Sequence, residues 1–146
     1  MSLFNIPLRH VPLLFIGTAI TVMSTPTYFN VPYGMRLYGL PDRIANSPTA
    51  HSSFVLYTSR IQAIGVMILA FYAKGNYEAV DTIVSIFGFF GLVDVYVCLK
   101  EGVRDKALFR GLSSGLVAAW GLAGMTAVSF EHLIRPVLAL HFAKLT

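Results

Sequence analysis

Charged residues are scarce in this chain of 146 residues. They make up 12% of the sequence, whereas a typical soluble domain has about a quarter. Hydrophobic residues reach 55%, and the mean hydropathy is +0.67. This composition excludes an ordinary soluble domain and indicates an integral membrane protein.

Cysteine is nearly absent. The single Cys98 excludes an internal disulfide and a zinc site built from cysteines. His10 and His141 have no partner at the spacing of metal ligands. We therefore predict no metal site and no cofactor.

Basic residues do not gather into one cluster. The net charge of +4 is spread over all the connections and interleaved with acids, as in KEGVRDKALFR from Lys100 to Arg110. Nucleic-acid binding needs a clustered basic surface, so we exclude it. Contact with lipid headgroups is the simpler interpretation, which makes membrane lipids expected partners. Lys74, Glu78 and Asp81 are most simply a solvated turn with helix-end charges.

Long apolar runs are what the sequence does contain. They are Val11 to Phe29, Ser53 to Ala73, Val80 to Leu99 and Ala107 to Phe130. About 20 residues of helix cross the ~30 Å hydrocarbon core of a bilayer. Because the connections leave no room for a soluble domain, we predict an all-α fold with one domain, residues 1–146, built as a bundle of four transmembrane helices. The segment LIRPVLALHFAKL near the end is typical of a short amphipathic helix on the membrane surface.

The first connection is unusually long. Residues 30–52 contain Tyr33, Asp42 and His51 and are interrupted by several prolines and glycines. A connection of this length is often a lid or a binding element. We expect it to cover one mouth of the bundle.

Asp94 is the least expected residue, because it interrupts the third apolar run. A carboxylate at membrane depth costs about 3 kcal/mol on insertion scales, so such residues usually face the protein interior and have a partner. Arg60, in the second run, lies at a similar depth from the same membrane face. We predict that Arg60 pairs with Asp94. A purely structural salt bridge is the alternative interpretation, and it stays open here.

Aromatic side chains accompany these two charges. Tyr57 lies one helical turn from Arg60, and Phe87 and Phe90 lie on the face of Asp94. We expect substrate-binding side chains around an apolar pocket, and they are Tyr33, His51, Phe87, Phe90 and Trp120. For Trp120, core packing is the alternative.

Three short motifs carry a family resemblance. They are Pro32-Tyr33-Gly34, YTSRIQAIG from Tyr57 to Gly65, and GLVDVYVCLKEG from Gly91 to Gly102. With them the chain resembles a fungal family of small four-helix integral-membrane proteins of formerly unknown function. The resemblance implies a place among natural-product pathways, where some small membrane proteins resemble epoxide hydrolases or cyclases that act on polyketide or terpenoid epoxides.

The first functional hypothesis is an enzyme that opens an epoxide of a lipophilic small-molecule substrate, by hydrolysis or cyclisation. Such chemistry needs a base for water or an internal hydroxyl and an acid for the epoxide oxygen. Asp94 would be the base, with Arg60 fixing its orientation. Tyr57 is the nearest candidate acid, and Asp42 is the other.

Two further hypotheses stay open. One is an isomerase or terpene cyclase, in which an acid starts a carbocation cascade. The other is a non-catalytic lipid-binding or scaffolding protein, in which Asp94 is structural. We expect the protein in the membrane of the endoplasmic reticulum, and the sequence leaves open whether it forms a homodimer or associates with pathway enzymes.

Overall fold

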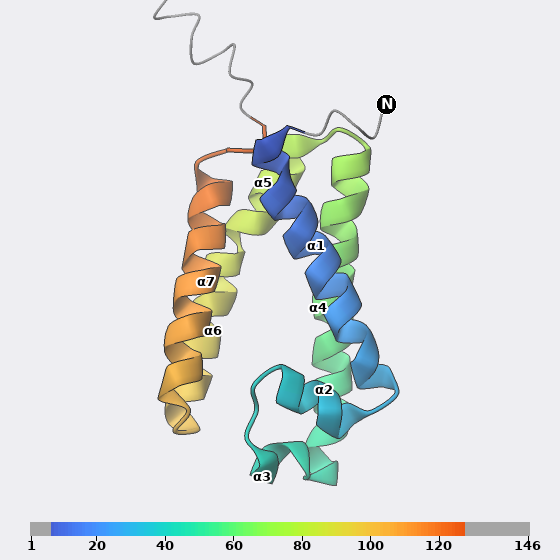
Figure 1. Ribbon diagram of the computed structural model, residues 1–146, viewed down its shortest axis with the longest axis vertical. Coiled ribbons are helices and arrows are strands. Elements are labelled where there is room, and N and C mark those ends of the chain that lie inside the picture. The colour runs from blue at the N-terminus through green and yellow to red at the C-terminus, as the bar shows by residue number, and fades with distance from the viewer. Residues whose placement is uncertain (1–6, 128–146) are drawn as a thin grey trace, which may run out of the picture.

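The computed structural model describes residues 7–127, and in this part of the chain every regular element is a helix (Figure 1). This confirms the predicted all-α class. The amphipathic helix predicted near the end of the chain lies outside the described residues. The elements are η1 (Leu8–His10), α1 (Val11–Ser24), η2 (Thr25–Tyr28), α2 (Val31–Leu37), α3 (Asp42–Ala45), α4 (Pro48–Ala73), α5 (Tyr77–Ser85), α6 (Phe87–Lys100) and α7 (Arg104–Leu122).

Three stretches of the described chain are long and apolar enough to cross a membrane: Leu8–Tyr28, Pro48–Ala73 and Tyr77–Lys100. They correspond to the first three predicted runs. Many of their large apolar side chains, such as Phe15 and Leu92, are exposed, as expected for contact with lipid. Helix α7, in the fourth predicted run, begins with several charged residues and is not among these stretches. The structure therefore supports three membrane spans and does not establish the fourth.

The helices form two arms that meet at one end (Figure 1). Helix α1 packs along α4 in one arm, and α6 packs along α7 in the other. Helix α5 contacts both α4 and α7 at the closed end, and a turn at Ile86 separates it from α6. Away from α5 the two arms diverge, so the molecule has the shape of a V, with α2 and α3 beside α4 near its open end.

Small residues allow the helices of each arm to approach closely. In the first arm, a Cβ added at Gly65 of α4 would lie 2.5 Å from the Thr21 hydroxyl of α1. In the second arm, a Cβ at Gly91 of α6 would lie 2.6 Å from the Cβ of Ser114, and one at Gly111 of α7 would lie 2.8 Å from Val95. This pairing through small residues is common between membrane helices.

The closed end of the V is held by Asp81 of α5. This residue is 4% exposed, and its carboxylate accepts hydrogen bonds from the backbone N–H groups of Thr126, at 3.1 and 3.2 Å, and Ala127, at 2.8 Å. The prediction of a solvated helix-end charge is therefore wrong for Asp81. The reason is tertiary: the chain after α7 turns back over α5 and delivers backbone donors that need a buried acceptor.

The long first connection is largely helical and packed. Asn30 caps α2, since its side chain accepts a hydrogen bond from the Tyr33 backbone N–H at 3.0 Å. Met35 of α2 and Ala45 of α3 form a small buried core with Phe54 of α4. The segment is a folded cap on the first arm, and the structure does not establish that it moves as a lid.

The contact between α5 and α7 can be tested at Gly121. A Cβ there would lie 2.5 Å from the backbone of Asp81 and Ser85, whereas a Cβ at Gly115 of the same helix meets nothing within 4 Å. We expect Gly121→Ala to lower the free energy of unfolding by about 1–3 kcal/mol, because the backbone cannot move aside cheaply. Gly115→Ala should be neutral or stabilising by up to about 1 kcal/mol. Unfolding in detergent micelles, followed by circular dichroism, measures both, and equal stabilities would contradict this packing.

Candidate functional site

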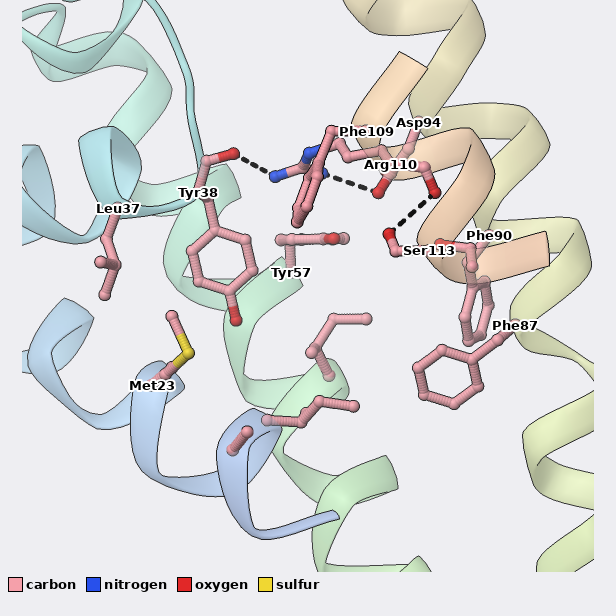
Figure 2. A pocket seen from close by; sticks show the side chains of 14 residues that line it. Met23, Leu37, Tyr38, Tyr57, Phe87, Phe90, Asp94, Phe109, Arg110 and Ser113 are labelled. Atoms are coloured by element: carbon pink, nitrogen blue, oxygen red, sulfur yellow. Dashed lines mark hydrogen bonds and ion pairs between the residues drawn. The ribbon is translucent and has the colours of Figure 1, made fainter. Parts of the chain in front are cut away.

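Asp94 of α6 is paired with Arg110 of α7. The Arg110 guanidinium donates a hydrogen bond from Nη1 to Asp94 Oδ2 at 2.7 Å (Figure 2). The side chains of Arg110 and Asp94 are 22% and 28% exposed. The two residues lie at matching distances from the turn that joins α6 to α7, so the antiparallel packing of these helices sets them opposite each other.

The prediction that Arg60 is the partner of Asp94 is wrong. Arg60 is exposed on α4, and no ion pair found in residues 7–127 joins it to Asp94. The reason is that α4 packs against α1, while α6 packs against α7. A similar depth in the membrane does not bring two residues together when their helices belong to different arms.

Asp42 also lies away from this pair. It forms an ion pair with Arg36 at 2.7 Å on the surface of the cap, where its side chain is 76% exposed. An arrangement of two acids around one arginine is therefore not formed at Asp94.

Arg110 makes a second contact that joins the two arms. Its Nη2 donates a hydrogen bond to the backbone carbonyl of Tyr38, which follows α2 in the cap (Figure 2). A second link at this end joins Arg43 of α3 to the carboxylate of Glu101, beyond α6. The open end of the V is thus bridged by two arginine contacts.

A cavity of about 320 Å³ lies between the arms beside the Asp94–Arg110 pair. We call it the first chamber. Its wall is mostly apolar, and the view in Figure 2 shows the rings of Phe87, Phe90 and Phe109 around it. Its lining residues are Ala19, Ile20, Met23, Leu37, Tyr38, Tyr57, Ile61, Phe87, Phe90, Asp94, Phe109, Arg110, Ser113 and Ser114. Four predicted site residues, Asp94, Tyr57, Phe87 and Phe90, are therefore brought to one cavity.

Two tyrosines provide hydroxyl groups at the site. Tyr57 of α4 reaches into the first chamber, and it interacts electrostatically with both Asp94 and Arg110. The Tyr38 hydroxyl is hydrogen-bonded to Ser24 at 2.9 Å. Burial raises the pKa of the Tyr38 phenol above its ordinary value, so this group remains protonated at neutral pH.

Three predicted substrate-binding residues do not line the first chamber. Tyr33 borders a surface hollow near the end of α1. His51 is hydrogen-bonded through Nε2 to the carbonyl of Ala45 at 2.9 Å. Trp120 lines a separate apolar cavity of about 170 Å³ with Leu13. Helical spacing gave no information on which arm each of these residues would join.

Sequence reasoning missed Arg110, Phe109 and Ser113 of α7 as residues of the site. A usable signal was present, because Gly102 marks the turn after α6 and Asp94 and Arg110 stand at similar distances on either side of it. Gly102 has φ 77°, a left-handed conformation that suits glycine in a tight reversal. Within residues 7–127, no three His, Cys, Asp or Glu side chains come together as a metal-ligand set.

The pairing of Asp94 with Arg110 predicts different effects for two arginine substitutions. Arg110→Met should lower the free energy of unfolding by about 1.5–3 kcal/mol, because it leaves a partly buried carboxylate without its charged donor. Arg60→Met, the same change at an exposed position, should alter it by less than about 0.5 kcal/mol. Chemical unfolding in micelles measures both. A larger loss of unfolding free energy from Arg60→Met than from Arg110→Met would contradict this pairing and support the predicted pair of Arg60 and Asp94.

Comparison with known proteins bears on the family alone. Comparisons with curated proteins and with solved structures gave no match. A family described as a domain of unknown function, DUF4267, matches residues 17–124, a stretch that includes every residue lining the first chamber. The match supplies no activity and no support for a fungal origin or for likeness to epoxide hydrolases. With most of its length covered by this match, the chain belongs to the DUF4267 family.

Proposed function

We propose that this protein is a membrane-embedded enzyme that opens an epoxide of a lipophilic polyketide or terpenoid intermediate, by hydrolysis or cyclisation, at the Asp94–Arg110 pair. The observation that supports it most is a partly buried carboxylate, ion-paired and facing an apolar cavity of about 320 Å³ beside a phenol. Apolar cavities with a few converging polar groups are typical of ligand sites. A buried ion pair often costs more in desolvation than it returns, which favours a functional reason for it.

The wall of the first chamber suits a lipophilic substrate. The rings of Phe87, Phe90 and Phe109 give apolar contact, and the polar groups lie together on one part of the wall. A substrate dissolved in the membrane would keep its apolar surface buried and bring its oxygen atom to Asp94, Arg110 and Tyr57.

The reaction follows from these positions. In hydrolysis, the Asp94 carboxylate accepts a proton from water as the water oxygen attacks one epoxide carbon. The bond between that carbon and the epoxide oxygen breaks, and the Tyr57 hydroxyl donates its proton to the departing oxygen, which gives a diol. The proton on Asp94 then returns through solvent to the Tyr57 phenolate. In cyclisation, a hydroxyl group of the substrate takes the place of water.

Arg110 takes over the role first assigned to Arg60. Its bond to Asp94 Oδ2 fixes the direction of the carboxylate, and no hydrogen bond found within residues 7–127 occupies Oδ1, which can accept a proton. Arg110 is thus a positioning residue for Asp94. Tyr57 is the acid, because Asp42 is paired on the surface and lies away from the chamber.

Helix α7 as a fourth membrane-spanning element belongs to this proposal. Leu108, Leu112 and Leu116 lie four residues apart on α7 and are all exposed, which gives this helix an apolar outer stripe suited to lipid. A lipophilic substrate class also accords with the endoplasmic reticulum as the location, and with the cap of residues 30–52 acting as a lid over the site.

One observation favours a second candidate, a non-catalytic lipid-binding or scaffolding protein. Arg110 joins the two arms through Asp94 and the Tyr38 carbonyl, which is what a structural cross-link would do. In that case the cavity would hold lipid, and the pair would set only the spacing of the arms.

Replacement of the base should abolish turnover. We expect Asp94→Asn to reduce product formation by at least about 100-fold, because the amide cannot accept the proton from water. Asp42→Asn, the same change at a surface acid, should keep wild-type turnover. The assay uses equal amounts of folded protein in membranes, a panel of lipophilic polyketide and terpenoid epoxides, and mass spectrometry of products formed in oxygen-18 water.

The product masses separate the candidates. Gain of one labelled water shows hydrolysis, and unchanged mass shows cyclisation or isomerisation. Full turnover by Asp94→Asn would refute the role of Asp94, and the absence of product from the wild type would favour the non-catalytic candidate.

The assigned acid has its own test. Tyr57→Phe should slow turnover by about 100-fold, since it removes the proton donor and keeps the ring in the wall. Tyr28→Phe removes another phenol from the same arm, one hydrogen-bonded to Gln62 outside the chamber, and should leave the rate unchanged. Single-turnover rates of the two variants measure the difference, and equal rates would assign the acid elsewhere.

A further inference from the structure

A second cavity of about 310 Å³ lies next to the first chamber. We call it the second chamber. Leu40 and Phe54 line it from the first arm and its cap, and Val93, Val97 and Cys98 line it from α6. Like the first chamber, it is mostly apolar.

The two chambers share four lining residues: Tyr38, Tyr57, Asp94 and Arg110. They are the charged and phenolic residues of the candidate site. Arg110 reaches from α7 to Asp94 on α6 and to the Tyr38 carbonyl in the cap, so its side chain crosses the space between the arms. The ion pair therefore lies where the two apolar chambers adjoin, and the site does not end at Asp94.

The volumes of the two chambers suggest that they act together. Ligand sites commonly have volumes of about 300–1,000 Å³, and each chamber alone is at the lower limit of this range. Taken together they fall well within it. The charged and phenolic groups stand where the chambers meet, and the first chamber also holds the hydroxyls of Ser113 and Ser114, of which Ser113 donates to the Arg110 carbonyl. A molecule that filled both chambers would therefore make most of its polar contacts near its middle.

We propose that the two chambers form one binding site for an elongated, neutral lipophile that carries an oxygen function near the middle of its chain and places one apolar arm in each chamber. This deepens the proposed function, on which it rests for the chemistry alone: the epoxide opened at Asp94 would be internal and not terminal. Binding itself does not depend on turnover, so the two proposals can fail separately.

The single cysteine of the chain offers a reporter. Cys98 lines the second chamber and not the first, while Met23 of α1 lines only the first. In the unsubstituted chain the thiol of Cys98 therefore reports on the second chamber. In the double variant Met23→Cys, Cys98→Ser, the new thiol at position 23 reports on the first. Ile20→Cys, also in the first chamber, replaces Met23→Cys if that variant does not fold.

The experiment measures the rate at which N-ethylmaleimide alkylates each reporter in lipid nanodiscs, with increasing amounts of 8-pentadecanone or 2-pentadecanone. These ketones have the same formula, differ in the position of the oxygen atom, and cannot undergo epoxide opening. At about ten times its Kd, 8-pentadecanone should slow alkylation of both reporters about tenfold, with one shared half-saturating concentration. 2-Pentadecanone should slow only one reporter.

Other outcomes overturn the proposal. Protection of one reporter only by 8-pentadecanone, protection of both at different concentrations, equal protection of both by the two ketones, or no protection would each show that the chambers are not one elongated site. The expected protection together with no epoxide turnover would keep the binding site and refute the enzyme. Turnover of terminal epoxides without shared protection would keep the enzyme and refute the single elongated binding site.

Discussion

The ion pair between Arg110 and Asp94 is the interaction on which the rest of the site depends. A carboxylate and a guanidinium among apolar helices each need the other, since both side chains are largely buried. Arg110 has donors left over, and one of them is taken by the Tyr38 carbonyl of the opposite arm. Within residues 7–127, the contacts of Arg110 and Arg43 join the arms at their open end, and two chambers lie in the space between them.

The elements near the site could be predicted from the sequence because membrane helices follow simple constraints. Long apolar runs gave the first three spans, and Asp94 was recognised because a charge is rare in such a run. Helical spacing then placed Phe87 and Phe90 on its face, and both line the first chamber. These inferences needed only the length of a helix and its period.

The partner of Asp94 could not be found in this way. Depth in the membrane suited Arg60, but the choice between neighbours is made by the fit of helix surfaces. Gly91 and Gly111 let α6 and α7 approach closely and so select Arg110. Asp81 shows the same limit, since its burial depends on backbone donors that arrive from 45 residues further along the chain.

The closed end of the V gives the arms a common pivot. There His10 of η1 is buried, its Nδ1 is 3.0 Å from the Tyr72 hydroxyl, and its ring contacts those of Tyr72 and Tyr77. Asp81 fastens the chain after α7 at the same end. Because the two arms are long and are joined at this end, a slight rotation here displaces their tips at the open end by a larger distance. The hydrogen bond from Arg110 to the Tyr38 carbonyl joins the arms near those tips, so it is the contact that such a rotation would stretch first.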